Sequence, residues 1–193
     1  MIELILGLGN IGREYSATRH NAGFEVVVRL ETMLKAKPQA QTPLYDWSTV
    51  VIDGQKKILA RPRTYMNRSG IAGLELLERL EITPDQMLVV VDDFNLPLGS
   101  LRFRLQGSDG GHNGLQSLID VLETRNFPRL RLGIGPVADN TDAADYVLAP
   151  FGPKERPAAE KMFDSAAAAV YYAMRHRLEE AMSKFNSTPA LPE

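Results

Sequence analysis

The sequence predicts a single α/β domain with three layers, α/β/α, in which helices cover both faces of a twisted mixed β-sheet. Two observations predict this fold class. Short apolar runs that suit strands alternate along the chain with longer segments of helical spacing, and one pair of strands is close enough in sequence to form a hairpin. The length of 193 residues favours one domain over two. We expect this domain to span residues 1–186 and a flexible C-terminal tail to follow over 187–193.

Strands are expected at short runs that are apolar or that alternate between apolar and polar residues. These are residues 2–8, 46–52, 57–61, 87–91, 100–105 and 130–134. Asp53 and Gly54 provide the turn of a hairpin between the second and the third of them. In the run 100–105, Leu101, Phe103 and Leu105 alternate with arginines, so one face of this strand should be buried and the other basic.

Helices are expected where apolar residues recur every three to four positions. These are residues 20–34, 69–80, 114–122, and one or two helices over 153–185. The first carries Phe24, Val27 and Leu34 at near-helical spacing. Helices that lie between strands act as crossovers, so the alternation predicts a mixed sheet with helices on it.

Composition excludes several kinds of site. The chain contains no cysteine, which excludes disulfides, thiolate metal sites and cysteine nucleophiles. It has no basic leader with an apolar core and no apolar run of the ~18 residues that a membrane span needs, so we expect a cytoplasmic protein. The formal net charge of -2 gives no general attraction to nucleic acid. Any contact with RNA must therefore come from a local basic patch.

Two glycine-rich segments are predicted to contribute to one functional site. Residues 7–23 and 107–114 each contain a His-Asn pair, and two of the three histidines of the chain lie in them. Glycine lets the backbone approach a ligand closely, while imidazole and amide groups can donate and accept hydrogen bonds. The third histidine, His176, lies in a helical stretch between two arginines and is expected at the surface.

Gly7, Gly9 and Gly12 form a GxGxxG pattern after the first strand, which raises the alternative of a dinucleotide site. Such a site needs a helix directly after the glycines and an acidic residue about 20 positions further on, after a second strand. Here the helix is delayed to about His20 and the next strand to about residue 46. The spacing therefore disfavours a nicotinamide cofactor.

Polar side chains gather near the ends of the predicted strands. They are Asn10, Asp92, His112 and Asn113. The strand before Asp92 is expected to end at Val91. Because α/β folds place their ligands at strand ends, we expect these side chains to converge with His20 and Asn67 on one cleft. For each asparagine taken alone, a turn or a helix cap is an equal alternative.

His20, Asp92 and His112 also raise the alternative of a zinc or iron site. The sequence has no HxH or HxxxH spacing, and the abundant asparagines are poor ligands for those metals. A GxSxG nucleophile elbow is absent as well. Water is the remaining nucleophile for a hydrolytic reaction.

Five segments, in order along the chain, resemble bacterial peptidyl-tRNA hydrolases. They are residues 7–24, 64–70, 91–99, 110–114 and 129–135. The resemblance extends from Ile2 to about Phe185. It implies a monomeric α/β hydrolase that cleaves the ester between a peptide and the terminal ribose of tRNA, without a metal or an organic cofactor. Such an enzyme recycles tRNA from the peptides dropped by stalled ribosomes.

The resemblance also implies roles for individual residues. His20 is the general base that activates water, and Asp92 orients its imidazole. The residues implied to bind the peptide backbone, to position the water or to stabilise the oxyanion are Asn10, Asn67 and Asn113. His112 and Tyr15 are implied to line the cleft.

A basic patch is expected to hold the tRNA. Arg102 and Arg104 alternate onto one face of a predicted strand, and Arg129 and Arg131 do so on another, which places four guanidiniums near the segment 107–114. Phosphate contacts of this kind position an acceptor stem without reading its sequence. Solvated strand faces are the alternative. The resemblance implies tRNA contact for Arg102, Arg104 and Arg131.

Two residues depart from the pattern of the family. Ile11 stands where the family usually has proline, and Asn95 stands where many members have aspartate. Neither carries the implied chemistry, so both bear on loop geometry. The family also includes plant relatives that act in RNA splicing without hydrolysis, which makes a non-catalytic RNA-binding protein the alternative function. The enzyme is favoured by the presence of His20, Asp92, Asn67 and Asn113.

Overall fold

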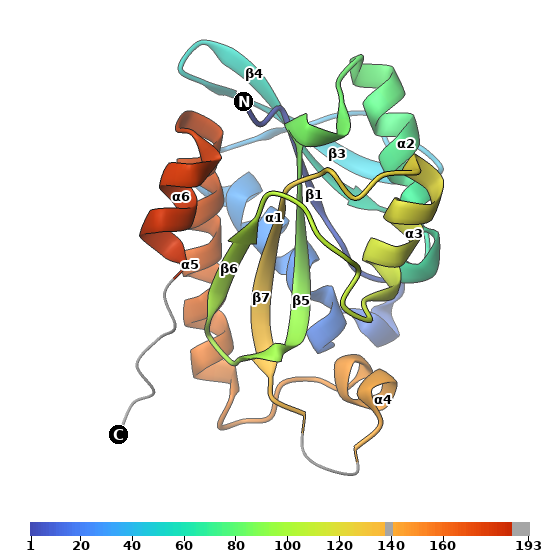
Figure 1. Ribbon diagram of the computed structural model, residues 1–193, viewed down its shortest axis with the longest axis vertical. Coiled ribbons are helices and arrows are strands. Elements are labelled where there is room, and N and C mark those ends of the chain that lie inside the picture. Colours follow the sequence, from blue (N-terminus) through green and yellow to red (C-terminus); the bar gives the residue numbers. More distant parts are fainter. Residues whose placement is uncertain (138–140, 187–193) are drawn as a thin grey trace.

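A seven-stranded mixed sheet forms the centre of the structure, a computed structural model that describes residues 1–137 and 141–186 (Figure 1). Its strands are β1 (Leu4–Gly7), β2 (Lys37–Pro38), β3 (Tyr45–Ile52), β4 (Gln55–Pro62), β5 (Met87–Pro97), β6 (Leu101–Arg104) and β7 (Arg129–Gly135). They lie in the order β2-β3-β4-β1-β5-β7-β6. β1 pairs in parallel with β4 and β5, and β5 with β7, whereas β2, β3 and β6 join antiparallel. The mixed sheet is therefore as predicted.

Helices cover both faces of this sheet (Figure 1). They are α1 (Ala22–Met33), α2 (Ser69–Leu80), α3 (Asn113–Leu122), α4 (Ala143–Leu148), α5 (Arg156–Arg175) and α6 (Leu178–Phe185). One apolar cluster joins the sheet to α2 and α3, and a second joins its other face to α1, α5 and α6. This arrangement confirms the three-layer α/β/α architecture. None of the described helices is long and apolar enough to cross a membrane.

The central strand β1 shows how the two clusters share the sheet. Leu4 and Leu6 pack into the cluster of α2 and α3, while Ile5 between them packs into the cluster of α1 and α5. All three are fully buried. Successive side chains of a strand point to opposite faces, and burying each of these side chains stabilises the fold by about 1.5–3 kcal/mol. A continuous apolar run is what a strand covered on both faces requires.

Several elements match their predicted bounds closely. β3 and β4 form the expected hairpin, with Asp53 at φ 49° and Gly54 at φ 79° in its turn. Two residues of positive φ are what a two-residue hairpin turn of type I′ needs. α2 covers residues 69–80 as expected. The segment 153–185 forms two helices, which separate at His176 and Arg177.

Two strand predictions are wrong in their ends. β5 continues to Pro97 instead of ending at Val91, because β7 runs alongside and pairs with it beyond that point, so Asp92 lies inside the strand. Leu105 was expected on the buried face of β6, but it follows the end of that strand at Arg104 and its exposed fraction is 42%.

A short strand and a short α-helix were not predicted. β2 contains two residues and α4 six, with Asp142 as the N-cap of α4. Elements of this length give too little periodicity to be recognised. The tail predicted over residues 187–193 lies outside the described part of the chain.

Glycines allow β1 and the start of α1 to touch. A Cβ atom built on Gly7 would lie 2.3 Å from the carbonyl oxygen of Gly23, closer than real contacts allow. Before α1 begins at Ala22, the chain makes two 3-10 turns, η1 (Arg13–Tyr15) and η2 (Arg19–Asn21). The helix therefore does not begin directly after the glycines, as a dinucleotide site would require.

Candidate active site

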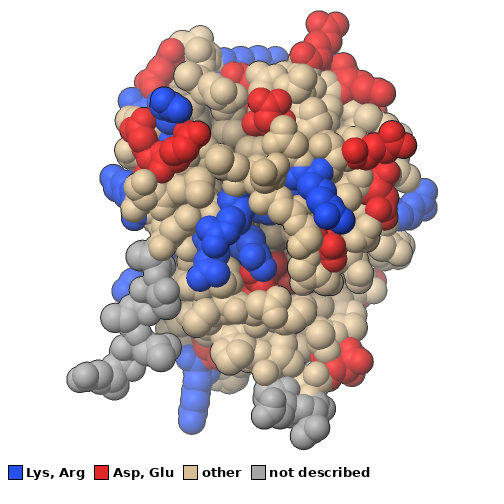
Figure 2. All heavy atoms as spheres, in the orientation of Figure 1, with Lys and Arg blue, Asp and Glu red and all other residues tan. Residues whose placement is uncertain are grey.

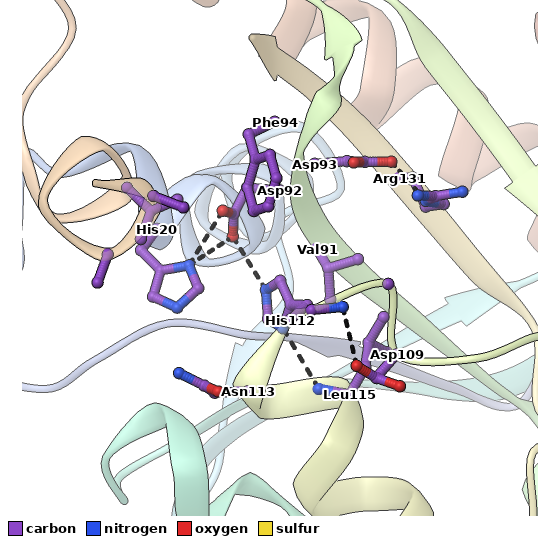
Figure 3. Close-up of a pocket in the computed structure, with 15 residues that line it drawn as sticks. His20, Val91, Asp92, Asp93, Phe94, Asp109, His112, Asn113, Leu115 and Arg131 are labelled. Atoms are coloured by element: carbon purple, nitrogen blue, oxygen red, sulfur yellow. Dashed lines mark hydrogen bonds and ion pairs between the residues drawn. The ribbon is translucent and has the colours of Figure 1, made fainter. Parts of the chain in front are cut away.

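The two glycine-rich loops meet at the carboxyl ends of the central parallel strands. His20 lies in η2, after β1, and Asp92 lies in β5. His112 comes directly before α3 as its N-cap. The three side chains are in contact and buried (Figure 3).

Asp92 is the centre of this group. Nδ1 of His20 lies 2.9 and 3.0 Å from the two carboxylate oxygens, and Nε2 of His112 lies 3.1 Å from Oδ1. Burial raises the pKa of the Asp92 carboxyl, but the charges and hydrogen bonds of the two imidazoles lower it more, so this pKa lies well below its ordinary value. Asp92 is therefore a carboxylate at neutral pH, and it accepts a hydrogen bond from each histidine.

The hydrogen bonds fix which nitrogen of each ring carries the proton. Nδ1 of His112 accepts from the backbone N–H groups of Gly114 and Leu115, so its proton is on Nε2, which donates to Asp92. Nδ1 of His20 donates to the same carboxylate, which leaves its Nε2 as an acceptor. No described residue bonds to that nitrogen, which is directed away from Asp92 (Figure 3). The site thus offers one free imidazole lone pair.

The same three residues could be considered as metal ligands, since one atom of each lies within 4.8 Å of the others. A metal needs an unprotonated lone pair from each histidine. Here the nitrogens nearest Asp92 carry the protons that they donate to it, and the other nitrogen of His112 is engaged by the backbone. The donor set is satisfied by hydrogen bonds and does not fit a metal in this arrangement.

Two hollows flank His20. One, of about 310 Å³, is lined by Asp92, Phe94, Asp109, His112 and Arg131 among others. The other, of about 210 Å³, is lined by Asn10, Tyr15, Tyr65, Met66, Asn67 and Leu148 among others. Four residues line both: His20, Asn113, Ala144 and Val147. The convergence expected from the sequence is therefore present, and all the predicted cleft residues face one of the two hollows.

The asparagines differ in whether their side-chain amides are already hydrogen-bonded within the protein. Oδ1 of Asn10 accepts from the backbone N–H of Met66 at 2.7 Å, and the backbone of Asn10 is held in turn by the side chain of Asn21. Asn67 and Asn113 line the smaller hollow and are exposed. Asn10 thus joins the β1 loop to the turn that carries Asn67, while Asn67 and Asn113 are exposed at the smaller hollow.

Comparison with known proteins identifies the family of this chain. The model of the peptidyl-tRNA hydrolase family matches residues 4–192. The chain belongs to the peptidyl-tRNA hydrolase family. It is 45% identical over 185 residues to the peptidyl-tRNA hydrolase of Aquifex aeolicus, covering 96% of each chain, and 44% identical over 191 residues to that of Synechocystis, covering 98% of each.

A crystal structure of peptidyl-tRNA hydrolase from Acinetobacter baumannii has the same fold. It matches with a TM-score of 0.91 and 32% identity, and the match covers 98% of this chain and 97% of that one. The resemblance stated from the sequence segments is confirmed. The seven-stranded sheet is thus the sheet of the peptidyl-tRNA hydrolase family.

The basic patch expected for this family lies on β6 and β7. Arg102 pairs with Arg131 in the register of the two strands, so their side chains share a face, and Arg104 follows two residues later. Arg104 is exposed and Arg102 partly so. Nε of Arg131 lies 2.5 Å from Oδ2 of Asp93, at the rim of the larger hollow. Figure 2 shows a group of basic side chains near the centre of this face.

Arg129 lies near the segment 107–114 as expected, but it is buried and does not belong to the exposed patch. Its exposed fraction is 1%, and it donates to the carbonyl groups of Gly107, Ser108, Arg125 and Phe127. Buried carbonyl groups need donors, and the loop before α3 folds back over the start of β7. Burial, together with the charge of Arg131, lowers the pKa of Arg129 to about 10. This side chain holds the loop that leads to His112.

Some lining residues were not singled out from the sequence. Tyr65 forms an edge-to-face pair with Tyr15, with ring centroids 6.4 Å apart, at one wall of the smaller hollow. Tyr65 lies inside the segment 64–70 that resembles the family, so that resemblance could have indicated it as a lining residue. Ala144 and Val147 were missed because they lie on α4, which was not predicted. His176 is at the surface as expected, with 41% of its side chain exposed.

Proposed function

We propose that this protein hydrolyses the ester bond between a peptide, or an N-blocked aminoacyl group, and the terminal ribose of tRNA, with His20 as general base. The observation that carries the proposal is the free Nε2 of a buried His20 whose other nitrogen is anchored on the Asp92 carboxylate. Membership of the peptidyl-tRNA hydrolase family supplies the substrate.

The first step follows from this geometry. Nε2 of His20 takes a proton from a water molecule as the water oxygen attacks the ester carbonyl carbon. The imidazolium that forms is stabilised by the ionised Asp92, which also fixes the ring in the tautomer needed. The carbonyl oxygen becomes an oxyanion, to which the exposed amide of Asn113 or Asn67 can donate a hydrogen bond.

The second step returns the proton. The tetrahedral intermediate expels the ribose oxygen, and the His20 imidazolium protonates it, so that free peptide acid and tRNA with a ribose hydroxyl leave. His20 ends as it began, with Nε2 unprotonated. In this scheme His112 does not exchange a proton, because Nδ1 faces two backbone donors and Nε2 donates to Asp92.

The peptide and the tRNA are assigned to different groups of residues. Asn10, Asn67 and Asn113 surround the hollow in which peptide amides would be recognised, with Tyr15 beside them. Arg102, Arg104 and Arg131 are proposed to contact phosphates of the acceptor stem. We further propose that the enzyme works as a cytoplasmic monomer without a metal, as the resemblance implies.

One experiment tests both the activity and its selectivity. Purified protein is incubated with N-acetyl-aminoacyl-tRNA and, separately, with the unblocked aminoacyl-tRNA. Release of acid from the first and much slower release from the second is the expected result, because a free ammonium cannot replace the peptide amide. Binding of tRNA without any release would instead indicate the non-catalytic RNA-binding relative.

A further inference from the structure

Arg19, the residue before the proposed base, is a buried cation that contacts a distant part of the chain. Its side chain is 8% exposed, and its Nη2 lies 2.6 Å from Oε2 of Glu155. Nη1 donates to the carbonyl groups of Tyr146 and Ala149, each at 3.3 Å. The guanidinium also lies over the rings of Tyr146 and Phe151, 4.3 and 5.3 Å from their centroids. Every one of these contacts is with the segment 146–155.

Helix α4, whose end overlaps the start of that segment, forms a wall of the candidate active site. Ala144 and Val147 of α4 line both hollows beside His20. Leu148 lines the smaller one, where it is 42% exposed. The position of α4 therefore sets the width of the space in which a substrate must fit.

A helix as short as α4 depends on tertiary contacts for its position. It has six residues, and isolated helices shorter than about 12 residues are marginal in water. Its N-cap Asp142 supplies local support, and Tyr146 donates from its hydroxyl to the carbonyl of Ile134. Among the described residues, Arg19 supplies further polar support, including the backbone bond from its N–H to the Ala149 carbonyl at 3.0 Å.

We propose that Arg19 is a positioning residue that fixes α4 against the turn of His20 and thereby sets the affinity of the enzyme for its substrate. This inference rests on the proposed function. Arg19 lines neither hollow and does not contact the reacting atoms. It affects substrate binding indirectly, through the position of α4.

The geometry requires an arginine. A planar guanidinium can bond to two carbonyl groups and a carboxylate while stacking on an aromatic ring, whereas the ammonium of lysine is a compact point charge. Arg19→Lys keeps the pairing with Glu155 but loses the stacking on Tyr146. The lysine variant should therefore restore only part of the effect of losing the arginine.

The test compares Arg19→Met with a matched variant, Arg29→Met. Arg29 also pairs with acidic residues of α5, Glu160 and Asp164, and lies over Phe163, but it lines neither hollow. We expect Arg19→Met to raise the KM for N-acetyl-aminoacyl-tRNA about tenfold with kcat changed less than about threefold, because the misplaced wall loosens substrate binding. Amide hydrogens of residues 143–149 should exchange at least about tenfold faster.

Arg29→Met should change neither KM nor the exchange of these amides. If Arg19→Met folds poorly, Glu155→Gln serves as a second variant, because it removes the negative charge of the ion pair at its more exposed partner. It should shift KM and the exchange rate in the same direction by a smaller factor. Unchanged KM and unchanged exchange in both variants would overturn the inference, as would equal changes in the Arg29→Met control. Absence of cleavage by the parent enzyme would instead contradict the proposed function.

Discussion

The two His-Asn pairs of this chain differ in which member has a side-chain group that is free to bind a ligand. In the loop after β1, His20 presents a free ring nitrogen, whereas Asn21 is fully used on the backbone of Asn10. In the loop before α3, both ring nitrogens of His112 are engaged, and Asn113 is the exposed member that lines the hollows. The same dipeptide thus supplies an imidazole with a free ring nitrogen at one loop and an exposed amide at the other.

Local backbone geometry explains the difference. His112 is the N-cap of α3, so the first N–H groups of that helix engage its Nδ1. His20 lies in a 3-10 turn and is not the N-cap of α1, a position that Asn21 occupies. Among the described residues, Asp92 is the hydrogen-bond partner of the His20 ring, through Nδ1.

The largest effect should come from His20. We expect His20→Ala to reduce kcat at least about a hundredfold while tRNA binding survives, since a positioned base contributes typically 10² to 10⁴ in rate. Asp92→Asn should also be slow, and the double variant should be little worse than His20→Ala alone, because the two side chains act as a unit. Steady-state kinetics measure this. Activity of His20→Ala within tenfold of the parent, or losses that multiply, would contradict the mechanism.

The two asparagines provide the next contrast. Asn113→Ala should lower the selectivity for N-acetyl-aminoacyl-tRNA over aminoacyl-tRNA about tenfold, since the amide that reads the peptide is lost. Asn21→Ala should leave that ratio unchanged and lower the free energy of unfolding by about 1–3 kcal/mol, because buried backbone groups of Asn10 lose their partners. Parallel assays of both esters and urea unfolding measure the two effects. If the selectivity changed in Asn21→Ala and not in Asn113→Ala, Asn21 would be the asparagine that reads the peptide.

His112 should matter more for stability than for the chemical step. His112→Ala removes the N-cap of α3 and should lower the free energy of unfolding by about 0.5–2 kcal/mol, with kcat reduced about tenfold or less. His112→Asn keeps a capping acceptor and serves as the matched variant, with stability closer to the parent. A loss of kcat as large as that of His20→Ala, at unchanged stability, would show that the two histidines share the reaction.

The smallest effects should come from the arginines outside both loops. Replacing Arg102, Arg104 or Arg131 by Gln should raise the KM for tRNA substrates a few-fold and reduce the slope of log K against log salt by somewhat less than ~1 for each phosphate that is no longer neutralised. Short ester analogues without the acceptor stem should be unaffected, and Arg29→Gln is the control outside the patch. Unchanged KM and unchanged salt slope for all three variants would contradict the patch.

The amino-acid sequence determined the features that depend on local spacing. Alternation and helical periodicity predicted the three layers, the β3–β4 hairpin and the range of α2, because side chains repeat every two or 3.6 residues whatever surrounds them. Glycine-rich segments with paired polar residues predicted the two loops. Those segments contain Asn10, His20, His112 and Asn113, the end of a predicted strand indicated Asp92, and the family resemblance implied Tyr15, whereas other lining residues, among them Tyr65 and the wall formed by α4, were not singled out.

Tertiary structure alone decided how each polar group is used. The sequence has two equivalent His-Asn pairs and four similar arginines, but in the fold the backbone of Asn10 engages Asn21, the first turn of α3 engages Nδ1 of His112, and the loop at residues 107 and 108 helps to bury Arg129. β5 extends past Val91 because β7 pairs with it, and α4 rests on Arg19, more than a hundred residues away. A hydrogen-bond donor or acceptor is available to a ligand only after the fold has satisfied the buried groups around it, and local sequence does not specify those partners.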